Sequence, residues 1–126
     1  MSKDNLQILV LDDEPIVGKR LKTALEKSGH VVEVFEDSRQ ALRRLDEREF
    51  DIIVTDVRME EVDGIQVLEH VLERSARTKV IVITGYATVE VAREALAKGA
   101  FDFIAKPFKP DDLRQVIKKA AEALKD

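Results

Sequence analysis

Short apolar runs alternate with longer segments of helical period five times along the chain. Within the longer segments, apolar residues recur every three or four positions, the spacing of one buried helix face. The apolar runs cover residues 6–11, 31–35, 51–55, 79–84 and 101–105. We expect the five helices from Pro15 to Ser28, from Ser38 onward, around Ile65 to Leu72, from near Thr88 to Gly99, and from near Pro110 to Leu124. Regular alternation with short connections predicts an α/β fold, a parallel sheet covered by helices on both faces.

Individual residues mark the expected helix ends. Pro15 suits a first helical turn because its missing N–H would have no partner there, and Gly29 is expected to end that helix. Ser38 is expected to cap the second helix, and residues Ala121 and Ala123 to lie exposed on the last one. No linker, repeat or low-complexity tract interrupts the pattern, so we expect a single domain over residues 1–126.

Composition narrows the class of protein. Charged residues make up 37% of the chain, but both signs are mixed and the net charge is −4, so no basic face for nucleic acid is expected. The absence of cysteine excludes disulfides, thiol nucleophiles and thiolate metal sites. No apolar stretch approaches the ~18 residues of a membrane span, and the first residues do not open a signal peptide. We therefore expect a soluble, cytoplasmic domain that does not bind a membrane.

Five polar residues stand where apolar runs stop: Asp12, Asp13, Asp56, Thr84 and Lys106. In an open parallel sheet, the carboxyl ends of the strands lie at one edge, where ligands bind. Each residue taken alone has an ordinary explanation, because acids complement helix N-termini and hydroxyls begin turns. Three carboxylates brought together repel one another unless a cation neutralises them. Mg²⁺ prefers such oxygen ligands and leaves positions open for phosphate, so the set predicts a site for a divalent cation and a phosphoryl group.

The same residues lie in segments that resemble the receiver domain of two-component response regulators. The matching segments are LVLDDEP at 9–15, IIVTDVRMEEVDG at 52–64, VIVITGYAT at 80–88 and GAFDFIAKPF at 99–108. The resemblance covers essentially the whole chain and is strongest to receivers of the NtrC class of transcriptional activators. It implies a flavodoxin-like, doubly wound five-stranded sheet with strand order 2-1-3-4-5 and five helices. It also implies that Asp56 accepts a phosphoryl group from a sensor histidine kinase.

The resemblance assigns metal ligands as well. Asp13 would bind Mg²⁺ directly and Asp12 through water, and Asp56 and the backbone carbonyl of Arg58 would complete the protein ligands. The domain would act as a signalling switch, not as an enzyme with an external substrate, and would catalyse only its own phosphorylation and dephosphorylation.

A further set of residues would transmit the switch. By resemblance, Thr84 would donate a hydrogen bond to the phosphoryl oxygens and Lys106 would pair with them. Phe103 stands where the family couples an aromatic ring to this threonine, although plain core packing explains it equally well. Tyr86 and Arg58 occupy positions that tune dephosphorylation in the family, and bulky groups there favour a long-lived phosphoryl group. Glu60 replaces a proline common in the family, which removes no proposed ligand.

Output is expected through the surface of the fourth helix, fifth strand and fifth helix. The partners implied are an output domain or downstream protein and a phosphorylation-dependent homodimer, whether the chain acts alone or as the N-terminal domain of a larger regulator. The candidate contacts on this surface are Glu90, Arg93, Glu94, Lys98, Ala121 and Ala123.

Three other functions fit the sequence less well. A phosphatase of the haloacid-dehalogenase type would need a second Asp two residues after Asp56, where Arg58 stands. A flavin-binding flavodoxin would need a hydroxyl- and glycine-rich phosphate loop in place of Asp12 and Asp13. An interaction module with a decayed site is disfavoured because all five polar residues are present.

Overall fold

The computed structural model describes residues 5–57, 63–85 and 89–125, and within these ranges five strands alternate with five helices. The strands are β1 (Gln7–Leu11), β2 (Val31–Phe35), β3 (Ile52–Asp56), β4 (Lys79–Thr84) and β5 (Asp102–Ala105). The helices are α1 (Pro15–Lys27), α2 (Ser38–Glu47), α3 (Gly64–Arg74), α4 (Val89–Ala97) and α5 (Pro110–Leu124). The expected alternation is confirmed, with strand boundaries shifted by one residue at β1, β3 and β5.

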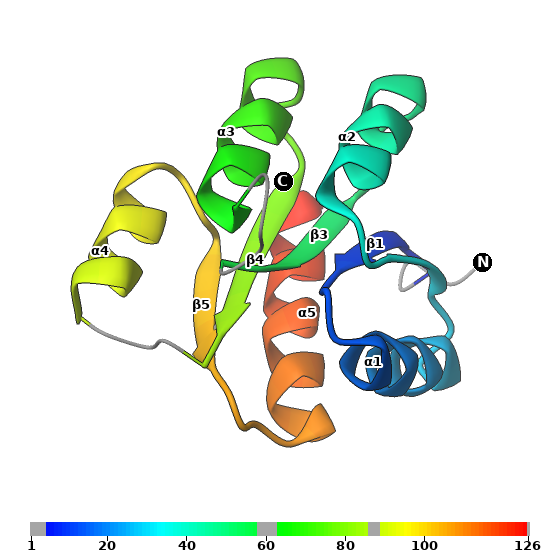
Figure 1. The fold of residues 1–126 in the computed structure, drawn as a ribbon. Helices are drawn as coiled ribbons and strands as arrows, with labels where there is room; N and C mark the ends of the chain where they lie inside the picture. The colour runs from blue at the N-terminus through cyan, green and yellow to red at the C-terminus, as the bar shows by residue number, and fades with distance from the viewer. Residues whose placement is uncertain (1–4, 58–62, 86–88, 126) are drawn as a thin grey trace.

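The strands form one parallel sheet in the order β2-β1-β3-β4-β5. This order confirms the flavodoxin-like, doubly wound topology (Figure 1). β2 lies on one side of β1, and β3, β4 and β5 follow in order on the other side, so β1 and β3 are neighbours within the sheet. The carboxyl ends of these two strands therefore meet at the point where ligands bind in such sheets.

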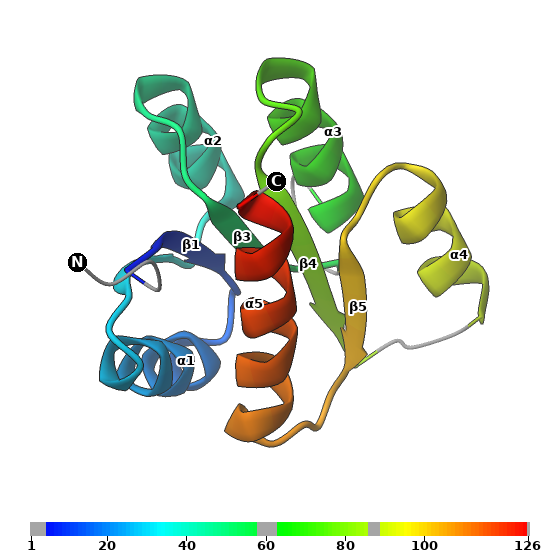
Figure 2. The ribbon, with the colours of Figure 1, turned by 180° about the vertical axis from the view of Figure 1, so that it is seen from behind.

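Helices cover both faces of the sheet, as Figures 1 and 2 show from opposite sides. Alternate residues of each central strand point to opposite faces. Ile8 and Val10 pack with α1 and α5, whereas Leu9 and Leu11 pack with α2, α3 and α4. Residues Ile8 to Leu11 have no exposed surface, which agrees with the continuous apolar run in the sequence. Two separate cores thus hold the central strands rigidly.

Helix ends follow the expected chemistry with one correction. Pro15 begins α1, and Gly29 follows its end with a φ of 94°, a backbone conformation that favours glycine. Ser38 was expected to cap α2, but the cap is Asp37, whose carboxylate accepts hydrogen bonds from the amides of Arg39 and Gln40. Ser38 is the first residue inside the helix and is buried. Both residue types cap well, so the sequence alone could not separate adjacent candidates.

The expected exposed face of α5 is partly wrong. Ala121 is 7% exposed and belongs to the core with Ile117 and Leu25, because it lies four residues after Ile117 on the same helix face. Ala123 is half-buried. On α4, in contrast, Glu90, Arg93 and Glu94 are exposed as expected, and so is Lys98, which directly follows the helix.

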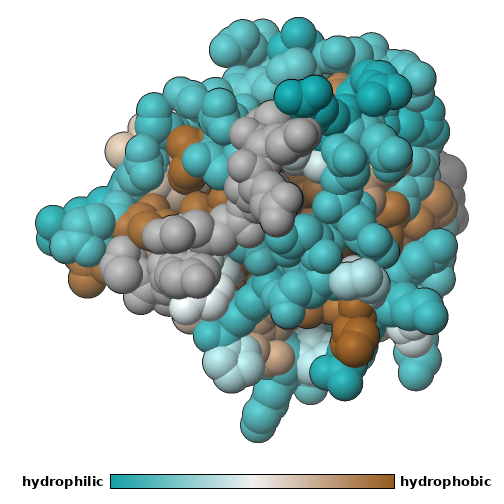
Figure 3. Space-filling view, viewed as in Figure 1, coloured by the Kyte–Doolittle hydropathy of each residue, from teal (hydrophilic) through white to brown (hydrophobic). Residues whose placement is uncertain are grey.

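Hydrophilic side chains cover most of the face seen in Figure 3, and small hydrophobic patches interrupt them on several sides, including the side where α4 lies. The exposed large apolar residues of α4 are Val89 and Leu96, at 60% and 50% exposure. Among the described residues, no helix has the length and apolar character needed to cross a membrane.

Candidate functional site

Strand register brings the predicted polar residues to one edge of the sheet. Asp12 directly follows β1, and Asp56 is the last residue of β3, whose neighbour Thr55 pairs with Leu11. Asp56 pairs in turn with Ile83, one residue before Thr84 at the end of β4. Lys106 directly follows β5, and its amide donates to the carbonyl of Thr84 at 2.8 Å.

Three carboxylates meet at this edge. Asp12 and Asp56 are buried, at 0% and 5% exposure, while Asp13 is exposed. One oxygen atom from each lies within 4.8 Å of the others, a spacing that could hold a metal ion. Each comes from a residue whose backbone is fixed by the rigid central strands or their immediate continuation. The predicted cluster is therefore present in the fold.

Lys106 reaches into the same cluster from β5. Its Nζ lies 2.8 Å from Oδ2 of Asp12, 2.7 Å from Oδ2 of Asp56 and 3.0 Å from Oε1 of Glu14. The side chain of Lys106 is only 15% exposed. The peptide bond between Lys106 and Pro107 is cis.

The charges at the site are unevenly compensated. Burial raises the pKa of Asp12 above its usual value, although hydrogen bonds from Lys106 and from the Glu14 amide act in the opposite direction. Burial lowers the pKa of Lys106, but its hydrogen bonds to Asp12, Asp56 and Glu14 outweigh this and raise it. A simple ion pair would lower the pKa of its acid. One ammonium group shared among three carboxylates secures its own charge without fully stabilising that of Asp12.

The backbone around Asp56 is packed against α3. The amide of Gly64 donates to the carbonyl of Val57 at 2.9 Å, and a Cβ on Gly64 would lie 2.2 Å from the carbonyl oxygen of Asp56. Only a residue without a side chain allows this approach. The capping box of Asp63 and Gln66 fixes the start of α3 beside it. Gly64 thus lets a rigid helix support the Asp56 backbone.

The donor set fits a hard divalent cation. Mg²⁺ takes oxygen ligands at about 2.0–2.1 Å in octahedral geometry, which places adjacent ligands about 2.9 Å apart and opposite ligands about 4.1 Å apart. One oxygen from each of Asp12, Asp13 and Asp56 lies within 4.8 Å of the other two, which is close to this spacing. Part of the negative charge remains uncompensated by Lys106, so a cation is also favoured electrostatically.

The remaining predicted residues divide into two groups. Phe103 is half-buried and packs against the core formed with α2, α3 and α4. Arg58, Glu60 and Tyr86 lie outside the described residues.

The sequence did not identify Glu14 as a partner of Lys106. The only signal was an acid at the beginning of α1, and its favourable interaction with the helix dipole was a sufficient explanation.

Comparison with known proteins identifies the family. Residues 8–118 match the model of the response regulator receiver domain. The transcriptional regulatory protein ZraR of Escherichia coli O157:H7 is 39% identical over 95% of this chain and 27% of its own length. The regulatory protein AtoC of Escherichia coli (strain K12) is 39% identical over 92% of this chain and 25% of its own length. The chain therefore spans about a quarter of the length of these curated relatives.

Solved structures agree with this result. The beryllofluoride-activated NtrC4 receiver domain dimer superposes with a TM-score of 0.89 at 36% identity, covering 94% of this chain and 98% of that chain. A CheY-like receiver domain protein from Methanospirillum hungatei JF-1 gives a TM-score of 0.92 at 28% identity, covering 96% and 97%. With the family model, the sheet order and the curated relatives in agreement, the chain belongs to the receiver domains of two-component response regulators, and its relatives include regulators of the NtrC class.

Proposed function

We propose that this receiver domain is a phosphoacceptor switch in which Asp56 takes a phosphoryl group from a sensor histidine kinase in a Mg²⁺-dependent reaction. The observation that carries the proposal is the convergence of Asp12, Asp13, Asp56 and Lys106 at the carboxyl edge of the sheet. Two carboxylates there are buried, although burial of an acid is unfavourable without compensation. A site that holds a metal and a phosphoryl group explains that arrangement.

In the proposed reaction, a carboxylate oxygen of Asp56 attacks phosphorus. A phosphorus–oxygen bond to Asp56 forms while the bond from phosphorus to the donor breaks, and the imidazole of the kinase histidine leaves with the electron pair. When bound by Asp12, Asp13 and Asp56, Mg²⁺ neutralises charge on the phosphoryl oxygens and orients them for transfer. The backbone carbonyl of Arg58 is proposed as a further ligand by resemblance.

Lys106 and Thr84 are proposed to read the new group. The Lys106 ammonium, already 2.7 Å from the Asp56 carboxylate, needs to move little to pair with a phosphoryl oxygen. Thr84 ends β4 at the same edge, and its hydroxyl is proposed to donate to a second oxygen. Lys106 and Thr84 are also joined through their backbones, so movement of one affects the other.

The readout is proposed to be the surface of α4, β5 and α5. α4 has one buried residue, Ala95, and exposes Val89 and Leu96, so few contacts hold it in one position. Phe103 on β5 packs into the same side of the sheet and is the proposed coupling residue. The exposed charges of α4 are proposed contacts for an output domain, a downstream protein or a second phosphorylated copy. The beryllofluoride-activated NtrC4 receiver domain is a dimer, which supports the last of these partners. A cytoplasmic location would accompany these partners.

The test is the intact mass after incubation with acetyl phosphate and Mg²⁺. We expect one added phosphoryl group, with acetate as the leaving group, and none with Asp56→Asn or without metal. Asp111→Asn, which changes an exposed aspartate at the start of α5, is the matched control and should be labelled normally. No adduct under conditions that label a known receiver would overturn the proposal and favour a phosphorylation-independent interaction module. Continuous release of phosphate from external substrates would instead indicate a phosphatase.

A further inference from the structure

Glu14 is the third partner of Lys106, and it differs from the other two. An ammonium group has three N–H donors, and those of Lys106 are directed to Asp12, Asp56 and Glu14. The Glu14 side chain is 64% exposed, whereas Asp12 and Asp56 are buried. Glu14 is thus the one acceptor of the three that lies at the mouth of the site.

The side chain of an N-cap residue commonly accepts a hydrogen bond from an amide of the first helical turn, but that of Glu14 does not. Glu14 is the N-cap residue of α1, yet its side chain makes no capping hydrogen bond. Its backbone amide donates to Oδ1 of Asp12 at 2.9 Å, and its carboxylate accepts from Lys106 instead. One residue therefore links the first strand's buried carboxylate to the lysine that follows the fifth strand.

This arrangement matters when a cation enters. Lys106 donates to Oδ2 of both Asp12 and Asp56, so a cation bound by these carboxylates competes with the ammonium group for their negative charge. A side chain that is 15% exposed cannot lose its charged partners without a free-energy cost. Glu14 offers Lys106 an acceptor that the cation does not take.

We propose that Glu14 is a positioning residue that retains the Lys106 ammonium beside the site while a divalent cation replaces it on Asp12 and Asp56. Glu14 thereby lowers the cost of exchanging ammonium for metal and keeps Lys106 ready for the phosphoryl group. The proposal rests on the proposed function, because it requires a metal at this site.

A double-mutant cycle in Mg²⁺ affinity, measured by calorimetry, tests it. Glu14→Gln should weaken Mg²⁺ binding about two- to fivefold, the range for one partly exposed ion pair. In the Lys106→Met background the same change should have no more effect than the control Glu36→Gln. Glu36 is a suitable control because it is an exposed acid that follows β2 at the same edge of the sheet, whereas the acceptors of Lys106 are Asp12, Glu14 and Asp56. Glu14→Asp, which keeps the charge but shortens the side chain, should behave like Glu14→Gln.

A second readout follows Lys106 itself. In Mg²⁺-saturated wild-type protein, the ¹⁵N-bound ammonium protons of Lys106 should exchange slowly with water, and in Glu14→Gln they should exchange faster. Equal weakening in both lysine backgrounds, or wild-type affinity in Glu14→Asp, would show that only the charge of Glu14 matters and would overturn the inference. A wild-type chain that binds no Mg²⁺ and is not labelled would overturn the proposed function as well, so the two failures are distinguishable.

Discussion

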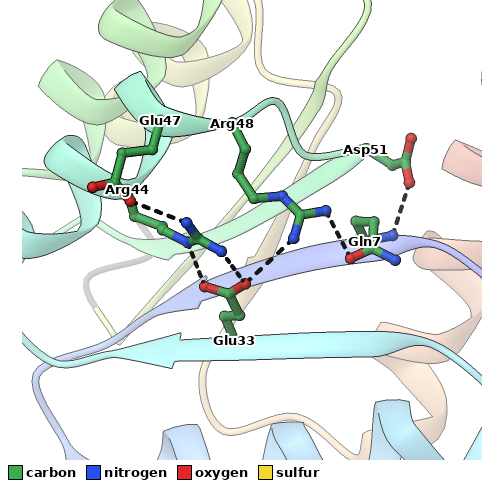
Figure 4. A network of polar contacts seen from close by, with 6 residues as sticks. All are labelled: Gln7, Glu33, Arg44, Glu47, Arg48 and Asp51. Carbon is green, nitrogen blue, oxygen red and sulfur yellow. Dashed lines mark hydrogen bonds and ion pairs between the residues drawn. The ribbon is translucent and has the colours of Figure 1, made fainter.

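Two networks of charged side chains stabilise different parts of the molecule, and they differ in balance. In the network of Figure 4, Glu33 on β2 pairs with Arg44 of α2 at 2.8 Å and with Arg48 at 3.6 Å. Arg44 also pairs with Glu47, and Arg77 pairs with Asp51. At the candidate site, among the residues that the structure describes, the four carboxylates of Asp12, Asp13, Glu14 and Asp56 are gathered near one ammonium group, that of Lys106.

The pKa values of one acid from each network move in opposite directions. Hydrogen bonds from Arg44 hold the pKa of Glu33 below its usual value, whereas burial raises that of Asp12. The charged form of Glu33 therefore favours the fold, and that of Asp12 opposes it. The network of Glu33 is balanced, because its acids are paired with arginines, and this fits a structural role. The network of Lys106 is unbalanced, because its acids outnumber its cation, and this indicates a site where a bound cation completes the charge.

The largest effect is expected where the backbone of the site is disturbed. Gly64→Ala places a methyl group 2.2 Å from the Asp56 carbonyl oxygen. The resulting shift of α3 or of Asp56 should lower the free energy of unfolding by about 2–4 kcal/mol, measured by urea denaturation, and slow labelling by acetyl phosphate. Gly85→Ala is the control, because among the described residues beyond its chain neighbours no atom lies within 4 Å of the added Cβ. Equal stability of the two variants would contradict the proposed support of Asp56 by α3.

A smaller effect of the opposite sign is expected from Asp12→Asn. This change removes a buried charge that opposes folding while Lys106 keeps Asp56 and Glu14 as partners. Metal-free protein should become more stable by about 1 kcal/mol, but Mg²⁺, which stabilises the wild type by binding only its folded state, should stabilise the variant much less. Denaturation with Mg²⁺ and with a chelator measures both. A loss of stability in the metal-free variant would show that the charge of Asp12 favours the fold, as the charge of Glu33 does, and would contradict the comparison.

Glu33→Gln should destabilise the fold, because the charged form of Glu33 is stabilised by its ion pairs with Arg44 and Arg48. Loss of its charge leaves Arg44 and Arg48 with weaker acceptors and should lower the free energy of unfolding by about 0.5–1 kcal/mol, the range for partly exposed ion pairs. Mg²⁺ affinity and labelling should stay at wild-type values. A change in either would mean that the two networks are coupled.

The sequence predicted the site better than it predicted this structural network. Asp12, Asp56 and Thr84 were identifiable because strand ends in a parallel sheet share one edge, so a position in the chain implies a position in space. The contact of Arg44 with Glu33 depends on the rotation of α2 against β2, and many charged residues on that helix could have made it. Periodicity gives the buried face of a helix but not the partner of each exposed side chain.

The same reasoning explains the specific errors. Asp37 and Ser38 are both good caps, and the choice between them depends on where the first helical turn closes. Ala121 was assigned to the surface because alanine is compatible with either environment, whereas its place four residues after Ile117 decides its burial. Glu14 is not identifiable from the sequence because its contact with Lys106 joins residues that are 92 positions apart in the chain.

The smallest expected effect is the pH dependence of the stability that the charge of Glu33 contributes. The pKa of Glu33 in the folded state is lower than its ordinary value of 4.5. Its stabilising contribution is therefore complete above pH 4.5 and is lost as pH falls through the lower folded-state pKa. The difference in unfolding free energy between wild type and Glu33→Gln should accordingly be constant from neutral pH down to about 5 and disappear in more acidic solution, where both side chains are uncharged. A difference that persisted in acid would mean that the substitution disturbs packing around Arg44 and not charge, and the contrast with Asp12 would then lose its electrostatic basis.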